Sequence, residues 1–200
     1  MSFSGDEPQQ FFSPLIGRTT TFVIDGRQAN LEFAAMVMSF VSRAGASCAI
    51  FDLDAFYSSN SDRTLSCMDV AAAGSSVIRI PEPGSGVETE FSRLFERGQK
   101  VVVIDSLNSL YHLLSLEDGA SGNRKLAFAL GALSYLARTC EKAVVLSMYR
   151  REGFFQAGTH RPISALTDST ASVEVSNGAV RIRTERGTLW PGGLFSSRIL

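Results

Sequence analysis

The sequence predicts an α/β domain built on a doubly wound, mostly parallel β-sheet that is flanked by helices and ends in an antiparallel hairpin. Strand-like and helix-like segments alternate along most of the 200 residues, which is the pattern of α/β folds. Two segments, 101–105 and 143–148, are continuous apolar runs, as in strands buried on both faces of a parallel sheet. Close to the C-terminus, Asn177-Gly178 separates two short strand-like segments and favours a tight hairpin turn.

Each predicted element has a local reason. The strands are β-branched or apolar runs, and the first of them, 19–25, ends at the turn signal Asp25-Gly26. The helices carry apolar residues at a helical spacing, and Gly45 and Gly98 follow two of them as stop signals. The predicted strands are 19–25, 47–53, 77–80, 101–105, 143–148, 171–175 and 180–184. The predicted helices are 31–41, 87–97, 106–116 and 124–139. Residues 149–168 show no convincing period.

The first 17 residues differ from the rest of the chain. They are polar, contain proline and place aromatic residues in patches, so we expect residues 1–17 to form a flexible N-terminal arm and residues 18–200 to form a single core domain. Phe11, Phe12 and Leu15 need apolar partners, which either this domain or a neighbouring subunit could supply.

Charge and cysteine content bound the class of protein. The formal net charge is −1, but residues 150–200 hold seven basic and four acidic groups and are net positive. Three cysteines at spacings unlike any metal knuckle indicate reduced core thiols. The chain shows neither a basic-then-apolar leader nor an apolar run of membrane-spanning length, so we expect a cytoplasmic protein without a membrane segment.

The order of motifs resembles the RecA/RadA recombinase superfamily, and especially its short archaeal RadB-like paralogs. The residues that carry the resemblance are the strand and turn 22–26, the acidic turn 50–54, the segment 101–111, which is similar to a Walker B strand, and the strand 144–147 with the long loop and hairpin that follow. The resemblance spans about residues 19–190. It implies a RecA-like ATPase core and a role in DNA recombination or repair.

The nucleotide site that the resemblance implies is degenerate. In the family, the loop after the first strand wraps phosphates and supplies a lysine and a magnesium-binding hydroxyl, but the first lysine of this chain is Lys100. Counting from Gly26 places Glu32 at the lysine position. A carboxylate about 4 Å from a phosphate costs on the order of 4 kcal/mol at an effective dielectric constant of about 20, and Arg27 is the only cation close by.

Two carboxylates complete this vestigial site. Asp54 falls at the position of the family's catalytic glutamate, and Asp105 ends the Walker B strand, whereas Met148 and Tyr149 stand where the family has a polar γ-phosphate sensor. We therefore predict no ATPase activity and no cofactor. Only two histidines occur, His112 and His160, and neither has a second ligand at a useful spacing, so no metal site is expected.

The long loop after the strand 144–147 corresponds to a DNA-binding loop of the family. It offers arginines for phosphates and aromatic rings for base stacking. The candidate nucleic-acid residues are Arg150, Arg151, Phe154, Phe155 and Arg161. The alternative is that the two phenylalanines close over the core or pack on another subunit. Arg181, Arg183 and Arg198 of the hairpin could extend a basic patch or could simply form its hydrated side.

These observations predict a non-catalytic paralog that assists DNA recombination or repair by binding single-stranded DNA, an active recombinase, or both. The alternative is a RecA-fold structural or regulatory subunit, of the KaiC-like or accessory-complex type, that forms homo- or hetero-oligomers and does not bind DNA. An ATPase with an unorthodox phosphate loop is a third, less favoured interpretation.

Overall fold

The computed structural model describes residues 7–65, 76–78, 98–116, 121–150 and 160–198. Its centre is an eight-stranded mixed sheet with the strand order β3-β2-β4-β5-β1-β6-β7-β8. The strands from β3 to β6 run parallel, and β7 and β8 are antiparallel to their neighbours. The strand bounds are β1 (Arg18–Ile24), β2 (Cys48–Asp52), β3 (Ser76–Ile78), β4 (Val101–Asp105), β5 (Ala143–Tyr149), β6 (Ser169–Ser176), β7 (Ala179–Arg186) and β8 (Leu194–Arg198).

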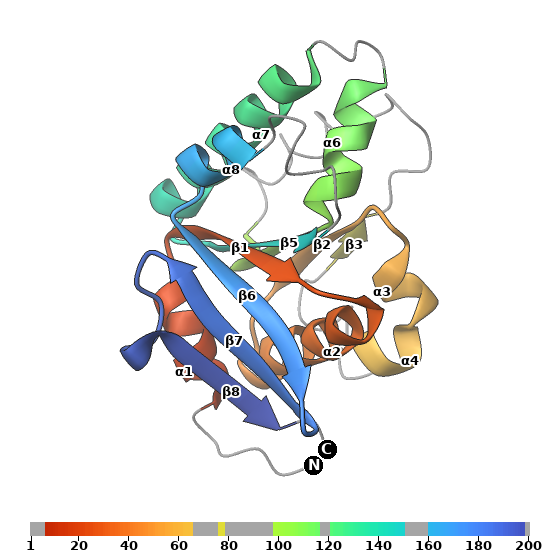
Figure 1. Cartoon of the computed structure of the whole chain (residues 1–200), viewed down its shortest axis with the longest axis vertical. Coiled ribbons are helices and arrows are strands. Elements are labelled where there is room, and N and C mark those ends of the chain that lie inside the picture. The colour runs from red at the N-terminus through yellow and green to blue at the C-terminus, as the bar shows by residue number, and fades with distance from the viewer. Residues whose placement is uncertain (1–6, 66–75, 79–97, 117–120, 151–159, 199–200) are drawn as a thin grey trace.

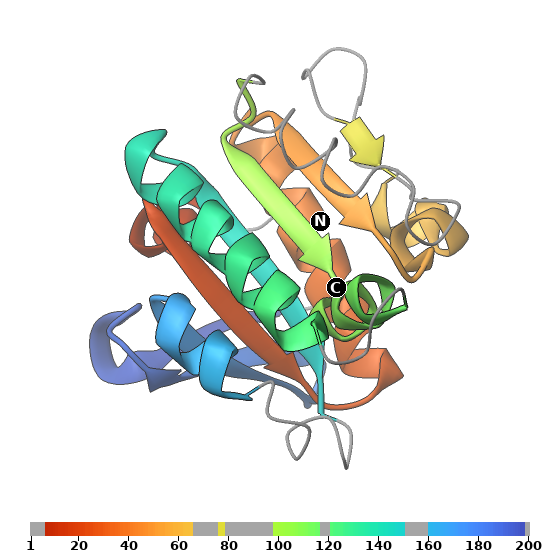
Figure 2. The same ribbon diagram turned by 90° about the horizontal axis from the view of Figure 1, so that it is seen from above.

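Helices cover both faces of this sheet (Figure 1). One face carries α1 (Glu7–Phe12), α2 (Arg27–Arg43) and the short helices α3 (Phe56–Ser59) and α4 (Ser61–Thr64). The other face carries α6 (Leu107–Ser115), α7 (Gly122–Thr139) and α8 (His160–Leu166), and α7 lies along β1 and β5 (Figure 2). The predicted doubly wound, mostly parallel sheet with a C-terminal antiparallel hairpin is therefore confirmed.

The continuous apolar runs reflect burial on both faces. Side chains alternate between the two faces of a strand, and in β4 the side chains of Val101 and Val103 pack into the core around α2. Val102 and Ile104 pack into the core around α6 and α7. The strand accordingly has no hydrated face, and every residue of it is buried.

The hairpin has the turn that its sequence predicts. Asn177 and Gly178 have φ values of 53° and 68°, and positive φ at both central residues is the requirement of a type I′ turn. The antiparallel strand β8 and the helix α8 were not predicted, nor were the short helices α1, α3 and α4. The predicted helix 87–97 lies outside the described residues.

The described part of residues 1–17 packs on the domain itself. Phe11 is completely buried, and its ring contacts Phe22, Phe40, Trp190 and Phe195 at centroid distances between 5.3 and 6.1 Å. The Trp190 indole N–H donates a 3.2 Å hydrogen bond to the carbonyl of Gln10. The sequence left open whether this segment docks on its own domain or on a neighbouring subunit. In the structure it docks on the core of its own domain.

Candidate functional site

A cavity of about 450 Å³ lies where β1, β2 and β5 reach their carboxyl ends. Ligands of open α/β sheets bind at this edge. The cavity brings together Gly26, Arg27 and Asp54 of the predicted vestigial site and Arg150 of the predicted nucleic-acid site. Its other lining residues are Ile24, Ala55, Phe56, Ser59, Asn60 and Tyr149.

The turn from β1 to α2 consists of two residues only. β1 ends at Ile24 and α2 begins at Arg27, so Asp25 and Gly26 form the whole connection. A phosphate loop needs several residues between strand and helix, so that successive backbone N–H groups can surround the phosphates. Gly26 has φ 86°, a backbone conformation that glycine adopts readily. The turn is therefore tight and offers no loop of the family's length.

This short turn moves Glu32 away from the position that counting assigned to it. The predicted helix began at residue 31, whereas α2 begins one turn earlier, and Glu32 lies in its second turn with 5% of its surface exposed. Its carboxylate pairs with the Arg63 guanidinium at 3.0 Å and accepts a 2.5 Å hydrogen bond from Gln28. Glu32 thus ties α4 to α2 and is absent from the described lining of the cavity.

Asp105 stands behind the cavity in a buried polar cluster. Its Oδ1 accepts hydrogen bonds from the Ser147 hydroxyl and, at 3.3 Å, from the Tyr149 hydroxyl. Asn30 of α2 donates to the same Tyr149 hydroxyl at 2.5 Å. This chain of contacts joins α2, β5 and β4, and it reaches the cavity through Tyr149, which lines it.

The charge of Asp105 is suppressed. Burial raises its pKa to about 7, with the carboxylates of Asp54 and Asp52 adding to the shift and the hydrogen bonds from Ser147 and Tyr149 opposing it. Its Oδ2 has no hydrogen-bond partner among the described residues. Asp105 therefore carries a proton for much of the time near neutral pH and is a weak ligand for a cation in this state.

Asp54 and Asp52 have structural partners of their own. Asp54 accepts hydrogen bonds from the hydroxyls of Ser106, at 2.8 Å, and Ser109 at the start of α6. Asp52 accepts two 2.9 Å bonds from the backbone N–H groups that open α3, and an acidic residue stabilises that end of a helix. Both carboxylates hold the turns that follow β2 and β4.

The two described arginines of the site differ in their surroundings. Arg27 is exposed at the uncapped N-terminus of α2 and has no ion pair or hydrogen bond among the described residues. Arg150 lies 3.9 Å from Glu185 and also lines a second cavity of about 310 Å³ on the α8 side of β1 and β5. A cationic side chain therefore lies between two hollows at the carboxyl edge of the sheet.

The remaining nucleic-acid candidates are only partly placed. Arg151, Phe154 and Phe155 lie outside the described residues, and Arg161 falls in α8. Arg181 and Arg183 project from β7 to the exposed side of the hairpin, where Arg181 faces Glu174 across the ladder. The exposed side of the hairpin is accordingly mixed in charge.

Sequence reasoning missed the contacts among neutral polar residues that organise the site. Asn108 accepts a 2.8 Å hydrogen bond from the Tyr149 backbone N–H, and Asn30, Ser147 and Tyr149 surround Asp105. Two of these residues, Ser147 and Tyr149, lie in β5, where alternation assigns a face but no partner, and the two asparagines lie in α2 and α6. The polar Ser147 inside an apolar strand is the one signal that pointed to a buried polar cluster.

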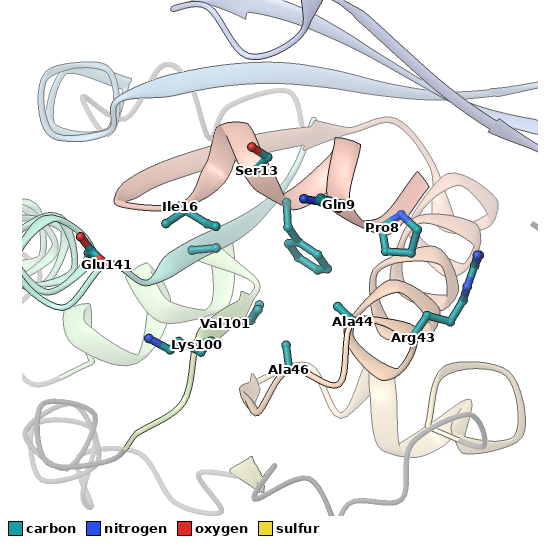
Figure 3. Close-up of a pocket in the computed structure, with 12 residues that line it drawn as sticks. Pro8, Gln9, Ser13, Ile16, Arg43, Ala44, Ala46, Lys100, Val101 and Glu141 are labelled. Carbon is teal, nitrogen blue, oxygen red and sulfur yellow. The ribbon is translucent and has the colours of Figure 1, made fainter. Parts of the chain in front are cut away.

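A larger cavity, of about 780 Å³, lies at the opposite edge of the sheet (Figure 3). It lies between α1, the end of α2 and the first residues of β4 and β5, and it is lined mostly by apolar and small side chains. Three charged residues, Arg43, Lys100 and Glu141, also border it. Because it lies at the amino ends of the strands, it is separate from the cavity beside Asp54.

Among the residues that the structure describes, no group of three or more histidine, cysteine, aspartate or glutamate side chains could hold a metal ion. None of the described helices has the length and apolar character needed to cross a bilayer.

Comparison with known proteins adds no assignment. No protein-family model matches the chain, and no curated protein matches its sequence.

Proposed function

We propose that this chain is a non-catalytic, RecA-like paralog that acts by binding and assists DNA recombination or repair through single-stranded DNA, an active recombinase, or both. The observation that carries the non-catalytic part is the two-residue turn between β1 and α2. Without a loop, backbone N–H groups cannot wrap a triphosphate, and the residue counted as the lysine equivalent is a buried glutamate paired with Arg63.

The state of Asp105 supports the same proposal. A catalytic magnesium site needs charged carboxylates, whereas burial raises the pKa of Asp105 to about 7. Asp54 is engaged by two serine hydroxyls. The carboxyl edge therefore retains the geometry of a ligand site while its acidic groups serve local structure.

The DNA part of the proposal depends on the cations at this edge. Arg27 and Arg150 both border the 450 Å³ cavity, and Arg150 immediately precedes the loop that holds Arg151, Phe154 and Phe155. Arginine contacts phosphate through two parallel hydrogen bonds, and aromatic rings stack on bases.

The nucleotide experiment compares wild type with Glu32→Lys, which restores a lysine at the counted position. We expect neither protein to gain thermal stability from ATP and magnesium, because the lysine would lie in the second turn of α2 without a phosphate loop before it. Steady ATP hydrolysis by purified protein, or an ATP-dependent rise in its melting temperature, would overturn the non-catalytic assignment.

The DNA experiment titrates a labelled single-stranded oligonucleotide over a range of salt concentrations. The double substitution Arg150→Ala with Arg151→Ala should weaken binding. It should also make the association constant less sensitive to salt: the negative slope of its logarithm against the logarithm of salt concentration should become shallower by about 1.4, since each phosphate contact contributes about 0.7. Arg43→Ala, at the opposite edge of the sheet, should leave both unchanged. Equal affinity and slope in all three proteins would remove this loop from the proposal.

A second candidate function is a structural or regulatory subunit that does not bind DNA. The observation that favours it is an exposed aromatic pair on α7, Phe128 and Tyr135, with 78% and 63% of their surfaces accessible. Exposed aromatic residues on one face are typical of protein interfaces. A stable protein complex that forms with no DNA affinity would support this alternative.

We also propose a cytoplasmic location. Cys48 is a buried thiol, and Cys140 is an exposed free thiol. Exposed free thiols suit a reducing compartment.

A further inference from the structure

The cavity between α1 and the amino ends of β4 and β5 leaves apolar surface uncovered. Ile16 lines it with 53% of its surface exposed, next to the buried side chains of Phe12 and Val101. Its volume of about 780 Å³ falls in the usual range of small-molecule sites, about 300–1,000 Å³. Such sites combine a mostly apolar lining with a few polar groups that orient the ligand. The cavity therefore has the size and the lining of a ligand site.

The charged residues of the lining lie at two ends of the cavity (Figure 3). Lys100 and Glu141 border one end, and Arg43 borders the other. Arg43 stands in the last turn of α2, where the negative end of the helix dipole stabilises a cation. Lys100 is exposed and forms no ion pair with the residues that the structure describes. Lys100 is therefore the cation that can receive an anionic group.

A second lysine adds positive charge near Lys100. Lys142 is buried, with 4% of its surface exposed. Burial lowers the pKa of its ammonium group, Cys140 opposes this shift, and the charge of Lys100 adds to it. The two ammonium groups thus repel each other, and the single carboxylate of Glu141 compensates one of them at most. An anion bound beside Lys100 would reduce this repulsion.

We propose that this cavity binds a small amphipathic monoanion, with its carboxylate beside Lys100 and an unbranched apolar chain along Phe12, Ile16 and Val101. The proposal goes beyond the proposed function and is independent of it, because the cavity beside Asp54 lies at the opposite edge of the sheet. It names the chemical class of the ligand and the orientation in which the ligand binds.

The backbone around the cavity favours an alkyl chain over a peptide. The N–H groups of Lys100 and Val101 both donate to the Ser47 carbonyl. The Ala143 N–H donates to the Lys100 carbonyl, and the N–H groups that follow α2 donate back to carbonyls of that helix. An extended peptide on a protein surface relies on hydrogen bonds to main-chain groups, and these donors are already used. An alkyl chain needs no such partners, because burial of its apolar surface supplies the affinity.

The experiment measures the binding of decanoate to the purified full chain by isothermal titration calorimetry, below the concentration at which decanoate forms micelles. 1-Decanol and the decylammonium ion have the same chain length and serve as the neutral and cationic probes. We expect decanoate to bind most tightly and decylammonium most weakly. Octanoate should bind about tenfold or more weakly than decanoate, since each buried methylene strengthens binding about fourfold.

Two charge substitutions with opposite expected effects test the position of the carboxylate. Lys100→Gln should weaken the binding of decanoate about threefold to fivefold, the effect of an ion pair at an exposed site. Glu141→Gln should strengthen it by a similar factor, and neither substitution should change the binding of 1-decanol. Lys125→Gln removes the same charge from the first turn of α7, at the other edge of the sheet, and should leave decanoate binding unchanged.

Ala44→Phe tests the apolar part of the cavity. Ala44 is exposed and lines the cavity (Figure 3), so a phenyl group there takes up ligand space without entering the core. We expect decanoate to bind at least about tenfold more weakly, while the melting temperature and the affinity for single-stranded DNA stay as in wild type.

Three results would overturn the proposal. The first is the absence of decanoate binding to wild type, and the second is equal binding of decanoate and decylammonium. The third is decanoate binding that changes in neither Lys100→Gln nor Ala44→Phe. Light scattering adds a further check, because a dimer of the free chain that dissociates in Ala44→Phe would show that a second copy occupies the cavity instead.

Discussion

Replacing Asp105 with asparagine should stabilise the fold above neutral pH. The pKa of Asp105 rises from 3.8 to about 7 on folding because burial penalises the charged form. The folded state thus binds a proton more tightly than the unfolded state between these values, and stability falls as pH rises through this window. At about 1.4 kcal/mol for each pH unit, the ionised carboxyl costs on the order of 4 kcal/mol above pH 7.

Asparagine removes the charge but introduces a new cost. Its oxygen can still accept from Ser147 and Tyr149, whereas its amide N–H₂ would occupy the place of Oδ2, which has no partner among the described residues. An unsatisfied buried donor costs about 1–3 kcal/mol. The net gain of Asp105→Asn should therefore be about 1–3 kcal/mol at pH 8.5 and should turn into a loss of about 1–3 kcal/mol as the pH approaches 4, where only the cost of the amide remains.

Urea unfolding of both proteins from pH 5 to pH 8.5 measures this difference. The exposed Asp25 supplies the matched substitution, and Asp25→Asn should change stability by less than about 0.5 kcal/mol, as is usual at the surface. If wild-type stability stays flat across the window, or if Asp105→Asn shifts stability equally at every pH, the reasoning about the buried carboxyl is refuted.

Three other experiments test parts of the fold. Phe11→Ala should cost about 3–5 kcal/mol in urea unfolding, the usual cost for a buried phenylalanine, whereas Ile16→Ala at an exposed site should cost under 1 kcal/mol; similar small losses would show that the first helix is not anchored. Gly26→Ala should lose about 1–3 kcal/mol because φ is 86° there, and a neutral result would contradict the tight turn. In a Cys67→Ser background, an aromatic disulfide reagent should modify Cys140 quickly and Cys48 only on unfolding, since burial raises the pKa of Cys48; rapid labelling that survives when Cys140 is also replaced by serine would count against this assignment.

The sheet could be predicted from the sequence because its signals are local. The run 101–105 needs only its own residues to indicate a strand buried on both faces, and Asn177-Gly178 needs only its own backbone preferences to indicate a hairpin. The strand β8 and the helix α1 could not be found this way. Their stability comes from the contacts of Phe11 with Trp190 and Phe195, which periodicity within a short window does not report.

The sequence was sufficient to predict which acidic residues lie at the site, but not how the surrounding helix and polar side chains are arranged. Asp54 and Gly26 lie at the same edge because all strands of a parallel sheet have their carboxyl ends there, even though β4 and β5 separate β2 from β1. The position of Glu32 depended on where α2 begins, and the polar first turn of that helix hid its start from an analysis of apolar spacing. The cluster of Asn30 and Tyr149 around Asp105 arises from tertiary packing alone.

The stacking of Phe11 on Trp190 joins residues that the ribosome makes far apart in time. The hydrogen bond from the indole to the Gln10 carbonyl spans 180 positions, and at about 5–20 residues per second roughly 9–36 s pass between the two. During that interval the aromatic rings of the first helix lack their final cover. The nascent chain must keep them from other hydrophobic surfaces until its closing strand arrives.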